Sequence, residues 1–259
     1  MIILPDQNYN FPNNEKIATY QFLAKSRCPV LDSVLFDENE ELTKEKLLVI
    51  KEVLQSEYCT VRYQYIKPSI NPVRGGNKTL IDIDELKNKK VDGTLMWLLQ
   101  PTERAKNTYG INLMINRNNN SFIIECVGKG FDISDINRGD MSPQETIYFK
   151  YPIEKGFQNE WWKYIKIDLV DQEEFERDKK IRLNKLRNFG LNVNENIFDN
   201  KFKPLDYGLI EKLIKYVDRI NSSWNKSDEY VVSLSMNNEG KLVFWDIQTP
   251  EGKAKILRK

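Results

Sequence analysis

The segment 229–250 constrains the fold most, because it combines two strand patterns with a tight turn between them. Apolar residues recur on both sides of the turn: Val231, Leu234 and Met236 before it, and Leu242, Phe244 and Trp245 after it. The turn is Asn237-Asn238-Glu239-Gly240, and a glycine in so short a connection is typical of a β-hairpin. The sequence therefore predicts an antiparallel hairpin over this segment.

Two polar residues, Asp246 and Gln248, stand at the end of the second strand of this hairpin. Polar groups on an otherwise buried strand are costly unless a partner binds them. Carboxylate and amide oxygens are suitable ligands for a Mg²⁺ ion that bridges phosphates. The alternative is an ordinary edge hairpin in which both side chains face water.

The chain has no histidine. This excludes Ser–His and Cys–His nucleophile activation, imidazole general-base catalysis, His-containing zinc sites and a phosphohistidine relay. Any chemistry must therefore use carboxylates, Lys, Arg, amides and a hard cation.

Composition indicates a globular chain that can bury a sizeable core, with 259 residues of which 40% are hydrophobic. With a net charge of +1, the chain as a whole has no strong electrostatic attraction to nucleic acid or anionic lipid. No apolar run is long enough for a membrane span, and the N-terminus lacks the features of a signal peptide. We expect a cytoplasmic protein with no nucleic-acid or membrane partner. The three widely spaced cysteines are expected to be small core hydrophobes: Cys28, Cys59 and Cys126.

Helical and strand patterns alternate along the chain, which predicts an α+β protein. Helices are expected at 15–26, at 44–56 with Thr43 as N-cap, at 171–188 with Asp171 as N-cap, and after Asp206. Strands are expected at 60–66, 80–83, 94–100, 110–116, 121–127 and 146–150. The polar segment 135–140 and the Asn-rich segment 189–205 are expected to be loops. In the charged helix, Phe175, Ile181 and Leu186 are available for packing.

Two further constellations could carry chemistry. Arg62 lies on a predicted strand and is followed by Arg74-Gly75-Gly76-Asn77-Lys78, where glycines allow backbone N–H groups to approach a phosphate. Glu125 precedes Gly128-Lys129-Gly130 and the Asp135, Asn137 and Arg138 cluster. The alternative for the first constellation is a common glycine turn between strands, and the alternative for the second is a solvated loop. For Trp161-Trp162-Lys163-Tyr164, a buried aromatic strand is favoured over base stacking.

The order of these motifs resembles the ATP-grasp nucleotide-binding domain found at the N-terminus of pyruvate phosphate dikinase and phosphoenolpyruvate synthase. The matching segments are Lys16 before Arg27-Cys28-Pro29-Val30, Val61-Arg62-Tyr63-Gln64, 74–78 with 80–82, Leu98-Leu99-Gln100-Pro101, Glu125 with 128–130, 139–143, and 231–250. The resemblance implies an ATP-grasp-like domain over 1–259, with two α/β subdomains (1–88, carrying a glycine-rich lid, and 89–259) that clamp a nucleotide between mixed or antiparallel sheets.

The resemblance also implies residue roles. Lys16 and Arg62 would bind the phosphates of ATP and act as the catalytic cations, with Gly75 and Gly76 in a lid over them. Gln100 would lie at the adenine edge with Glu125 nearby, and Asp246 and Gln248 would hold Mg²⁺. Ser233 departs from the family pattern, because a metal-binding Glu is expected there.

Two functions follow as hypotheses. The first is a Mg-ATP-dependent enzyme that activates an acceptor by phosphoryl transfer, as a kinase-like enzyme or as a ligase that forms an acyl phosphate. The acceptor would be a small molecule or a residue on another chain. The alternative is a degenerate domain that acts as a nucleotide sensor or scaffold for a partner subunit.

Overall fold

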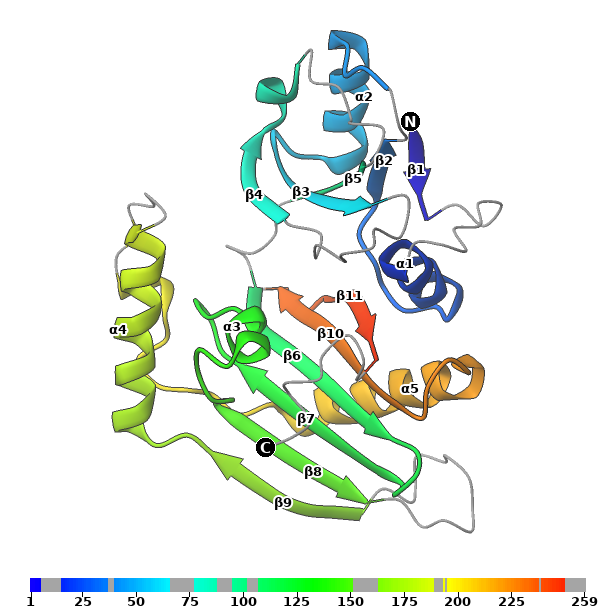
Figure 1. The fold of residues 1–259 in the computed structure, drawn as a ribbon. Helices are drawn as coiled ribbons and strands as arrows, with labels where there is room; N and C mark the ends of the chain where they lie inside the picture. The colour runs from blue at the N-terminus through cyan, green and yellow to red at the C-terminus, as the bar shows by residue number, and fades with distance from the viewer. Residues whose placement is uncertain are drawn as a thin grey trace. The chain divides into compact units, whose positions relative to one another are not determined.

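The chain folds into two compact units, residues 1–103 and 104–259, each with its own antiparallel sheet (Figure 1). The computed structural model describes residues 1–5, 15–36, 40–65, 77–87, 95–101, 107–150, 163–188, 193, 195–237 and 239–249. The expected α+β class is confirmed by this architecture. The subdomain division at residues 88–89 stays a prediction; the strand at 95–101 pairs within the N-terminal unit.

The N-terminal unit is built on a five-stranded sheet in the order β1-β2-β5-β3-β4. All neighbouring strands are antiparallel. The bounds are β1 Ile2–Leu4, β2 Ser33–Phe36, β3 Tyr58–Tyr65, β4 Asn77–Asp82 and β5 Leu95–Pro101. Successive strand side chains point to opposite faces, so each face of the sheet can bury its own apolar set.

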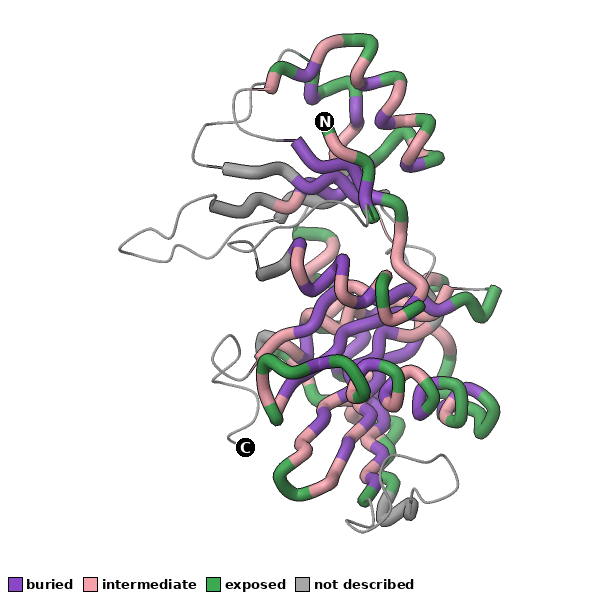
Figure 2. Tube along the Cα trace, turned by 90° about the vertical axis from the view of Figure 1, so that its right-hand side faces the viewer, coloured by how far each residue is buried: buried purple, intermediate pink, exposed green. Residues whose placement is uncertain are grey.

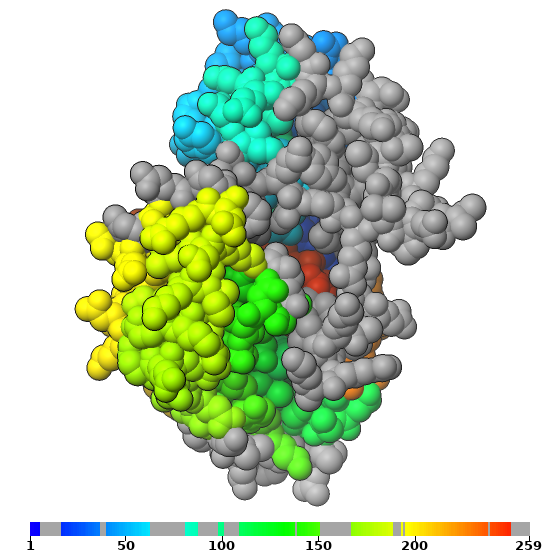
Figure 3. Space-filling view, turned by 60° about the vertical axis from the view of Figure 1, so that its left-hand side comes forward, coloured from blue at the N-terminus to red at the C-terminus, as the bar shows by residue number. Residues whose placement is uncertain are grey.

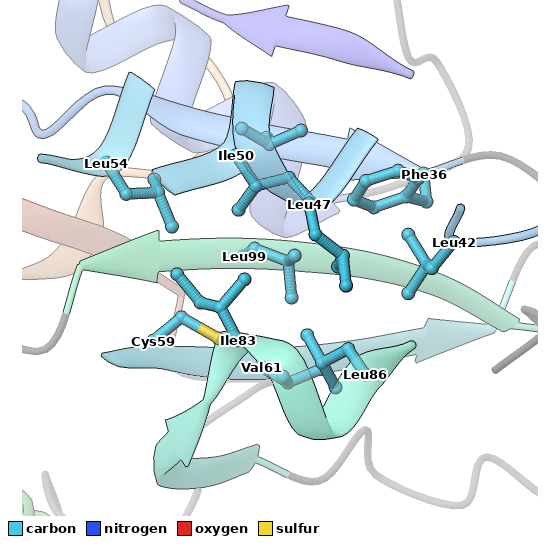
Figure 4. Packing of buried hydrophobic residues seen from close by; sticks show 11 residues of the cluster. Phe36, Leu42, Leu47, Ile50, Leu54, Cys59, Val61, Ile83, Leu86 and Leu99 are labelled. Atoms are coloured by element: carbon cyan, nitrogen blue, oxygen red, sulfur yellow. The ribbon is translucent and has the colours of Figure 1, made fainter. Parts of the chain in front are cut away.

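One face of this sheet is covered by α2 (Lys44–Leu54) and by the short 3₁₀ helix η1 (Ile83–Leu86) (Figure 4). The backbone N–H of Lys46 donates to Thr43 Oγ1 at 3.5 Å, which confirms the predicted N-cap. Apolar residues of α2 and η1 pack against the sheet: Leu47, Ile50, Leu54, Ile83 and Leu86, with Val34, Phe36, Cys59, Val61 and Leu99.

The other face is covered by α1 (Glu15–Lys25). Ile17 and Tyr20 of this helix pack with Leu4, Leu35 and Leu98. Leu35 and Leu98 are sequence neighbours of residues in the α2 core, so the two clusters lie on opposite faces of the sheet. The N-terminal unit is therefore a sheet between two helices.

The C-terminal unit is built on a six-stranded antiparallel sheet in the order β11-β10-β6-β7-β8-β9. The bounds are β6 Asn107–Asn116, β7 Ser121–Val127, β8 Glu145–Lys150, β9 Lys163–Leu169, β10 Glu229–Asn237 and β11 Leu242–Gln248. The β10–β11 pair confirms the predicted hairpin. Residues 161 and 162 of the predicted aromatic strand lie outside the described residues.

Helix α5 (Tyr207–Ser223) packs on one face of this sheet, where the Tyr216 and Phe244 rings lie 4.9 Å apart. Asp206 Oδ1 accepts the backbone N–H of Leu209 at 2.9 Å, as the predicted N-cap requires. Buried positions run along the central strands (Figure 2), and their apolar members on the α5 face include Leu113, Ile124, Ile147 and Leu234.

The opposite face carries α3 (Ile133–Arg138) and α4 (Gln172–Asn188), which form neighbouring parts of the surface in Figure 3. The prediction of a loop at 135–140 was wrong for most of that segment. Asp132 caps α3, and Gly139 ends it in the left-handed conformation with φ of 76°. Gly110 of β6 allows α3 to approach closely, since a Cβ there would lie 2.9 Å from Ile133 Cβ.

Helix α4 begins where the sequence predicted, with the backbone N–H of Glu174 donating to Asp171 Oδ1 at 2.8 Å. Phe175 and Leu183 are buried, but Ile181 is 46% exposed, so its expected role in packing was wrong. All three cysteines are buried free thiols, as predicted. Among the described residues, no helix combines the length and apolar character that a bilayer-crossing segment requires.

Candidate active site

A row of polar residues crosses the C-terminal sheet on the face opposite α5. Directly paired positions share one face of an antiparallel sheet. Read from β11 to β9, the paired positions are Asp246, Ser233, Asn112, Glu125, Thr146 and Asp168. We refer to these six residues as the polar row. Because polar groups on a sheet face need partners, the row is the strongest candidate site in this unit.

A β-bulge in β11 brings Asp246 onto this face. The pairing of β10 with β11 shifts register between Ser233 and Leu234, so Ser233 pairs with Asp246 while Leu234 pairs with Phe244. Trp245 is the extra residue of the bulge, and its Nε1 donates to Ser235 Oγ at 2.8 Å. Without the bulge, strict alternation would place Asp246 on the apolar face with Phe244.

Hydrogen bonds connect the row to its surroundings. Ser233 Oγ donates to Asn112 Oδ1 at 3.0 Å, and Asn112 Nδ2 donates to Asn137 Oδ1 of α3 at 2.9 Å. Asn112 is fully buried, and Ser233 and Asp246 are 5% and 6% exposed. Gln248 Nε2 donates to Asp246 Oδ2 at 2.8 Å. Asp246 therefore does not face water as the edge-hairpin alternative expected, although β11 is the edge strand of the sheet and Gln248 is partly exposed.

The row can offer a Mg²⁺ ion oxygen donors, although Asp246 and Glu125 cannot share one ion. They are separated by three inter-strand steps, or about 14 Å. The described residues contain no group of three or more His, Cys, Asp or Glu side chains that could hold a metal. Asp246, Ser233 and Gln248 Oε1 fit the sparse protein ligand set that Mg²⁺ uses when phosphates complete its shell, provided that the Gln248 amide rotates.

An ionic cluster fixes α3, and with it Asn137. Asp135 is 3% exposed and accepts from Arg182 Nη1 at 3.0 Å and from Lys185 Nζ at 2.6 Å, both on α4. Lys185 Nζ also lies 2.7 Å from Asp140. We refer to Asp135, Asp140, Arg182 and Lys185 as the α3–α4 clamp. The clamp holds α3 in place while Asn137 bonds to Asn112.

In the N-terminal unit, Arg62 and Gln100 lie on the face that α1 covers. Arg62 of β3 pairs with Leu98 of β5, and Gln100 pairs with Thr60. The two residues are therefore diagonal neighbours on adjacent strands, about 7–8 Å apart. Lys16 belongs to α1, but its side chain lies outside the described residues, as do Gly75 and Gly76 entirely.

A chain of buried hydrogen bonds leads from Gln100 to the backbone. Gln100 Nε2 lies 3.2 Å from Ser33 Oγ, which lies 3.3 Å from the Tyr20 hydroxyl, and Tyr20 donates to the carbonyl of Leu31. Gln100, Ser33 and Tyr20 are each at most 1% exposed. Burial raises the pKa of Tyr20, so its hydroxyl stays protonated. Gln100 Oε1 is buried and receives no hydrogen bond from the described residues.

Sequence reasoning selected Arg62, Gln100, Glu125, Asp246 and Gln248, and each is on a strand as expected. It did not select Asn112, Ser33 or Tyr20, whose roles depend on strand register and on contacts distant in sequence. A signal for Asn112 was present, because it is a lone amide between Ile111 and Leu113 on a central strand.

No family model and no curated protein sequence matches the chain. Solved structures do resemble it. D-alanyl-alanine synthetase A from Vibrio cholerae has a TM-score of 0.45 at 10% identity, over 93% of this chain and 56% of that one. Carboxyaminoimidazole ribonucleotide synthase from Aspergillus clavatus, complexed with ATP, has a TM-score of 0.41 at 9% identity, over 90% and 44%. The ATP-grasp ligase PsnB has a TM-score of 0.38 at 6% identity, over 91% and 52%. The chain spans about half the length of these proteins.

Proposed function

We propose that the chain is a Mg-ATP-binding enzyme of the ATP-grasp type, which activates an acceptor by phosphoryl transfer. The observation that carries this proposal is the buried Asp246, brought by a β-bulge onto the polar row beside Ser233 and next to Gln248. A carboxylate beside hydroxyl and amide oxygens is the kind of donor set that binds Mg²⁺ together with phosphates. The motif order along the sequence supports the same function.

The proposed roles follow from charge. Asp246 and Gln248 would hold Mg²⁺, which when bound neutralises the phosphates and orients them. Arg62 and Lys16 would bind the phosphate oxygens, with Gly75 and Gly76 in a lid over them. Gln100 would contact the adenine edge, and Glu125 would lie nearby. Phosphoryl transfer needs mainly positioning and charge neutralisation, and this set of side chains could provide both.

Nucleotide titration by calorimetry tests this function directly. With Mg²⁺ present, we expect ATP to bind with a micromolar Kd, or about −8 kcal/mol, and to bind more weakly when EDTA replaces the metal. Absence of binding under both conditions would contradict the proposal. Mg²⁺-independent binding would contradict the assignment of Asp246 and Gln248 as metal ligands.

The acceptor and the reaction type are further parts of the proposal. A kinase-like enzyme would leave a phosphorylated acceptor, whereas a ligase would pass through an acyl phosphate to an amide. Mass spectrometry of reactions with candidate carboxylate and amine acceptors separates the two. Because the acceptor could be a residue on another chain, the screen should include a copurifying partner subunit.

A second candidate function is a nucleotide sensor or scaffold that has lost turnover. The observation that favours it is the pairing of Asp246 with Ser233. The family that the sequence resembles has a metal-binding Glu at the position of Ser233, so the pair here carries only the carboxylate of Asp246. Such a domain would bind nucleotide without hydrolysing it. Multiple-turnover ADP release with any acceptor would contradict this alternative.

A further inference from the structure

Strand β9 is the outer strand of the C-terminal sheet, because the strand order ends there (Figure 1). On one side it pairs with β8, with Ile167 opposite Ile147 and Leu169 opposite Glu145. Among the described residues, no strand pairs with its other side. The outer side of such an edge strand offers unpaired backbone N–H and C=O groups to which another strand can bind.

The hydrogen bonds to β8 determine which residues of β9 can pair outward. The backbone N–H of Val170 donates to the carbonyl of Gln144 at 2.9 Å. In an antiparallel ladder, this bond makes the adjacent pair, Leu169 with Glu145, one that exchanges no hydrogen bonds of its own. The same type of pair recurs at every second position, which includes Ile167. The N–H and C=O groups of Ile167 and Leu169 therefore point away from β8, toward the open edge.

The same two residues carry exposed apolar side chains. Ile167 is 40% exposed and Leu169 is 53% exposed, and both lie on the α5 face of the sheet, next to Ile147. Natural edge strands are usually protected by charges, by bulges or by short length. A bulge does interrupt β9, but it lies at Ile165, before this stretch. Residues 166–169 thus form a regular edge with exposed apolar side chains.

We propose that this edge pairs with the same edge of a second copy of the chain, in an antiparallel register centred on Ile167. There Ile167 stands opposite the partner's Ile167 and exchanges two backbone hydrogen bonds with it. The sequence Lys166-Ile167-Asp168 is complementary to itself about this centre, since position 166 lies opposite the partner's Asp168 and Asp168 lies opposite the partner's Lys166. Leu169 becomes a diagonal neighbour of the partner's Ile167, so both copies bury apolar surface.

Charge also selects this register over its neighbours. A two-fold register centred on position 166 would place two lysines opposite each other, and one centred on position 168 would place two aspartates opposite each other. Like charges directly across an antiparallel pair are destabilising. Because the bulge limits the length of the contact, the dimer should be weak and reversible. It does not depend on nucleotide binding, so it stands or fails separately from the proposed function.

Analytical ultracentrifugation of the whole chain tests the association. Between about 5 and 500 µM, we expect the weight-average mass of the wild type to rise from the monomer value toward twice that value. Ile167→Lys places two like charges at the centre of the pairing and should remain monomeric over this range. Ile181→Lys changes a comparably exposed apolar residue on α4, at 46%, and should associate as the wild type does. A wild type that stays monomeric, or association that survives in Ile167→Lys, would overturn the proposal.

Cysteine cross-linking tests the register. In Ile167→Cys, the two Cα atoms would lie about 5.5 Å apart, a separation that a disulfide can bridge. We expect mild oxidation to give a covalent dimer, with little background because all three native cysteines are buried. Leu169→Cys would place its Cα about 14 Å from that of its own copy, so it should cross-link at least about fivefold less. Equal cross-linking at positions 167 and 169, or none at 167, would contradict the register centred on Ile167.

Discussion

Ser233 and Asp246 pair directly across β10 and β11, and their side chains share one face of the C-terminal sheet. The hydroxyl of Ser233 donates to Asn112, so it does not use its proton to stabilise the Asp246 carboxylate. Asp246 is instead bonded by the Gln248 amide. Because a neutral serine stands opposite Asp246 on β10, this pair avoids the repulsion that two facing carboxylates would cause.

The first prediction concerns the charge of Asp246. In Asp246→Asn, we expect Mg²⁺-dependent ATP binding to weaken at least about tenfold and any ATP turnover to be lost, because the amide keeps the shape but removes the charge that binds the metal. Calorimetry with and without Mg²⁺ measures the first effect. Asp228→Asn, at an exposed carboxylate, is the control and should bind as the wild type does. Full activity in Asp246→Asn would exclude this metal site.

The second prediction concerns Ser233. In Ser233→Asp, two carboxylates would face each other, so the metal-free protein should lose about 1 kcal/mol of unfolding free energy at neutral pH. Saturating Mg²⁺ should restore that loss and raise the thermal midpoint more than in the wild type. Thermal unfolding with and without Mg²⁺ checks both parts. If Mg²⁺ stabilises the wild type and the variant equally, no metal binds between these positions.

Local signals in the sequence predicted much of this fold. Thr43, Asp171 and Asp206 each cap the helix that their position indicated, because a capping side chain and its backbone donor are only a few residues apart. The hairpin at 229–250 was also predicted correctly, since its turn and both strands are adjacent in the chain.

The site was less accessible to prediction, because its geometry depends on register. The run Leu242, Val243, Phe244 and Trp245 does not alternate, and this irregularity was the only local sign of the bulge that turns Asp246 to the polar face. Asn112 and Ser233 are 121 positions apart in sequence, and a single-residue slip would separate them. Helix α3 was missed because six residues carry little helical periodicity.

The third prediction concerns the α3–α4 clamp. Asp135→Ala should lower the free energy of unfolding by about 2–3 kcal/mol, because it leaves Arg182 and Lys185 partly buried without their shared carboxylate. Glu174→Ala removes only an exposed pair with Arg177 on α4 and should cost less than about 0.5 kcal/mol. Urea denaturation measures both values. Comparable losses in the two variants would show that burial does not strengthen the clamp.

The fourth prediction concerns Asp218 on α5. Desolvation raises the pKa of this carboxyl from 3.8 to about 6, and its Oδ1 is buried without a hydrogen-bond donor among the described residues. The folded state therefore binds a proton more tightly than the unfolded state. The stability that this group contributes is fully present below about pH 3.8 and is lost as the pH rises through about 6.

Asp218→Asn keeps the neutral form at every pH, so it should match the wild type near pH 4 and be more stable by about 1 kcal/mol at pH 8, a value reduced for the partial exposure of the side chain. Urea titrations at pH 4, 6 and 8 measure the difference. Glu211→Gln, at an exposed carboxylate on the same helix, is the matched control and should show no such trend. A constant difference between Asp218→Asn and wild type across this range would mean that Asp218 ionises equally easily in the folded and unfolded chains.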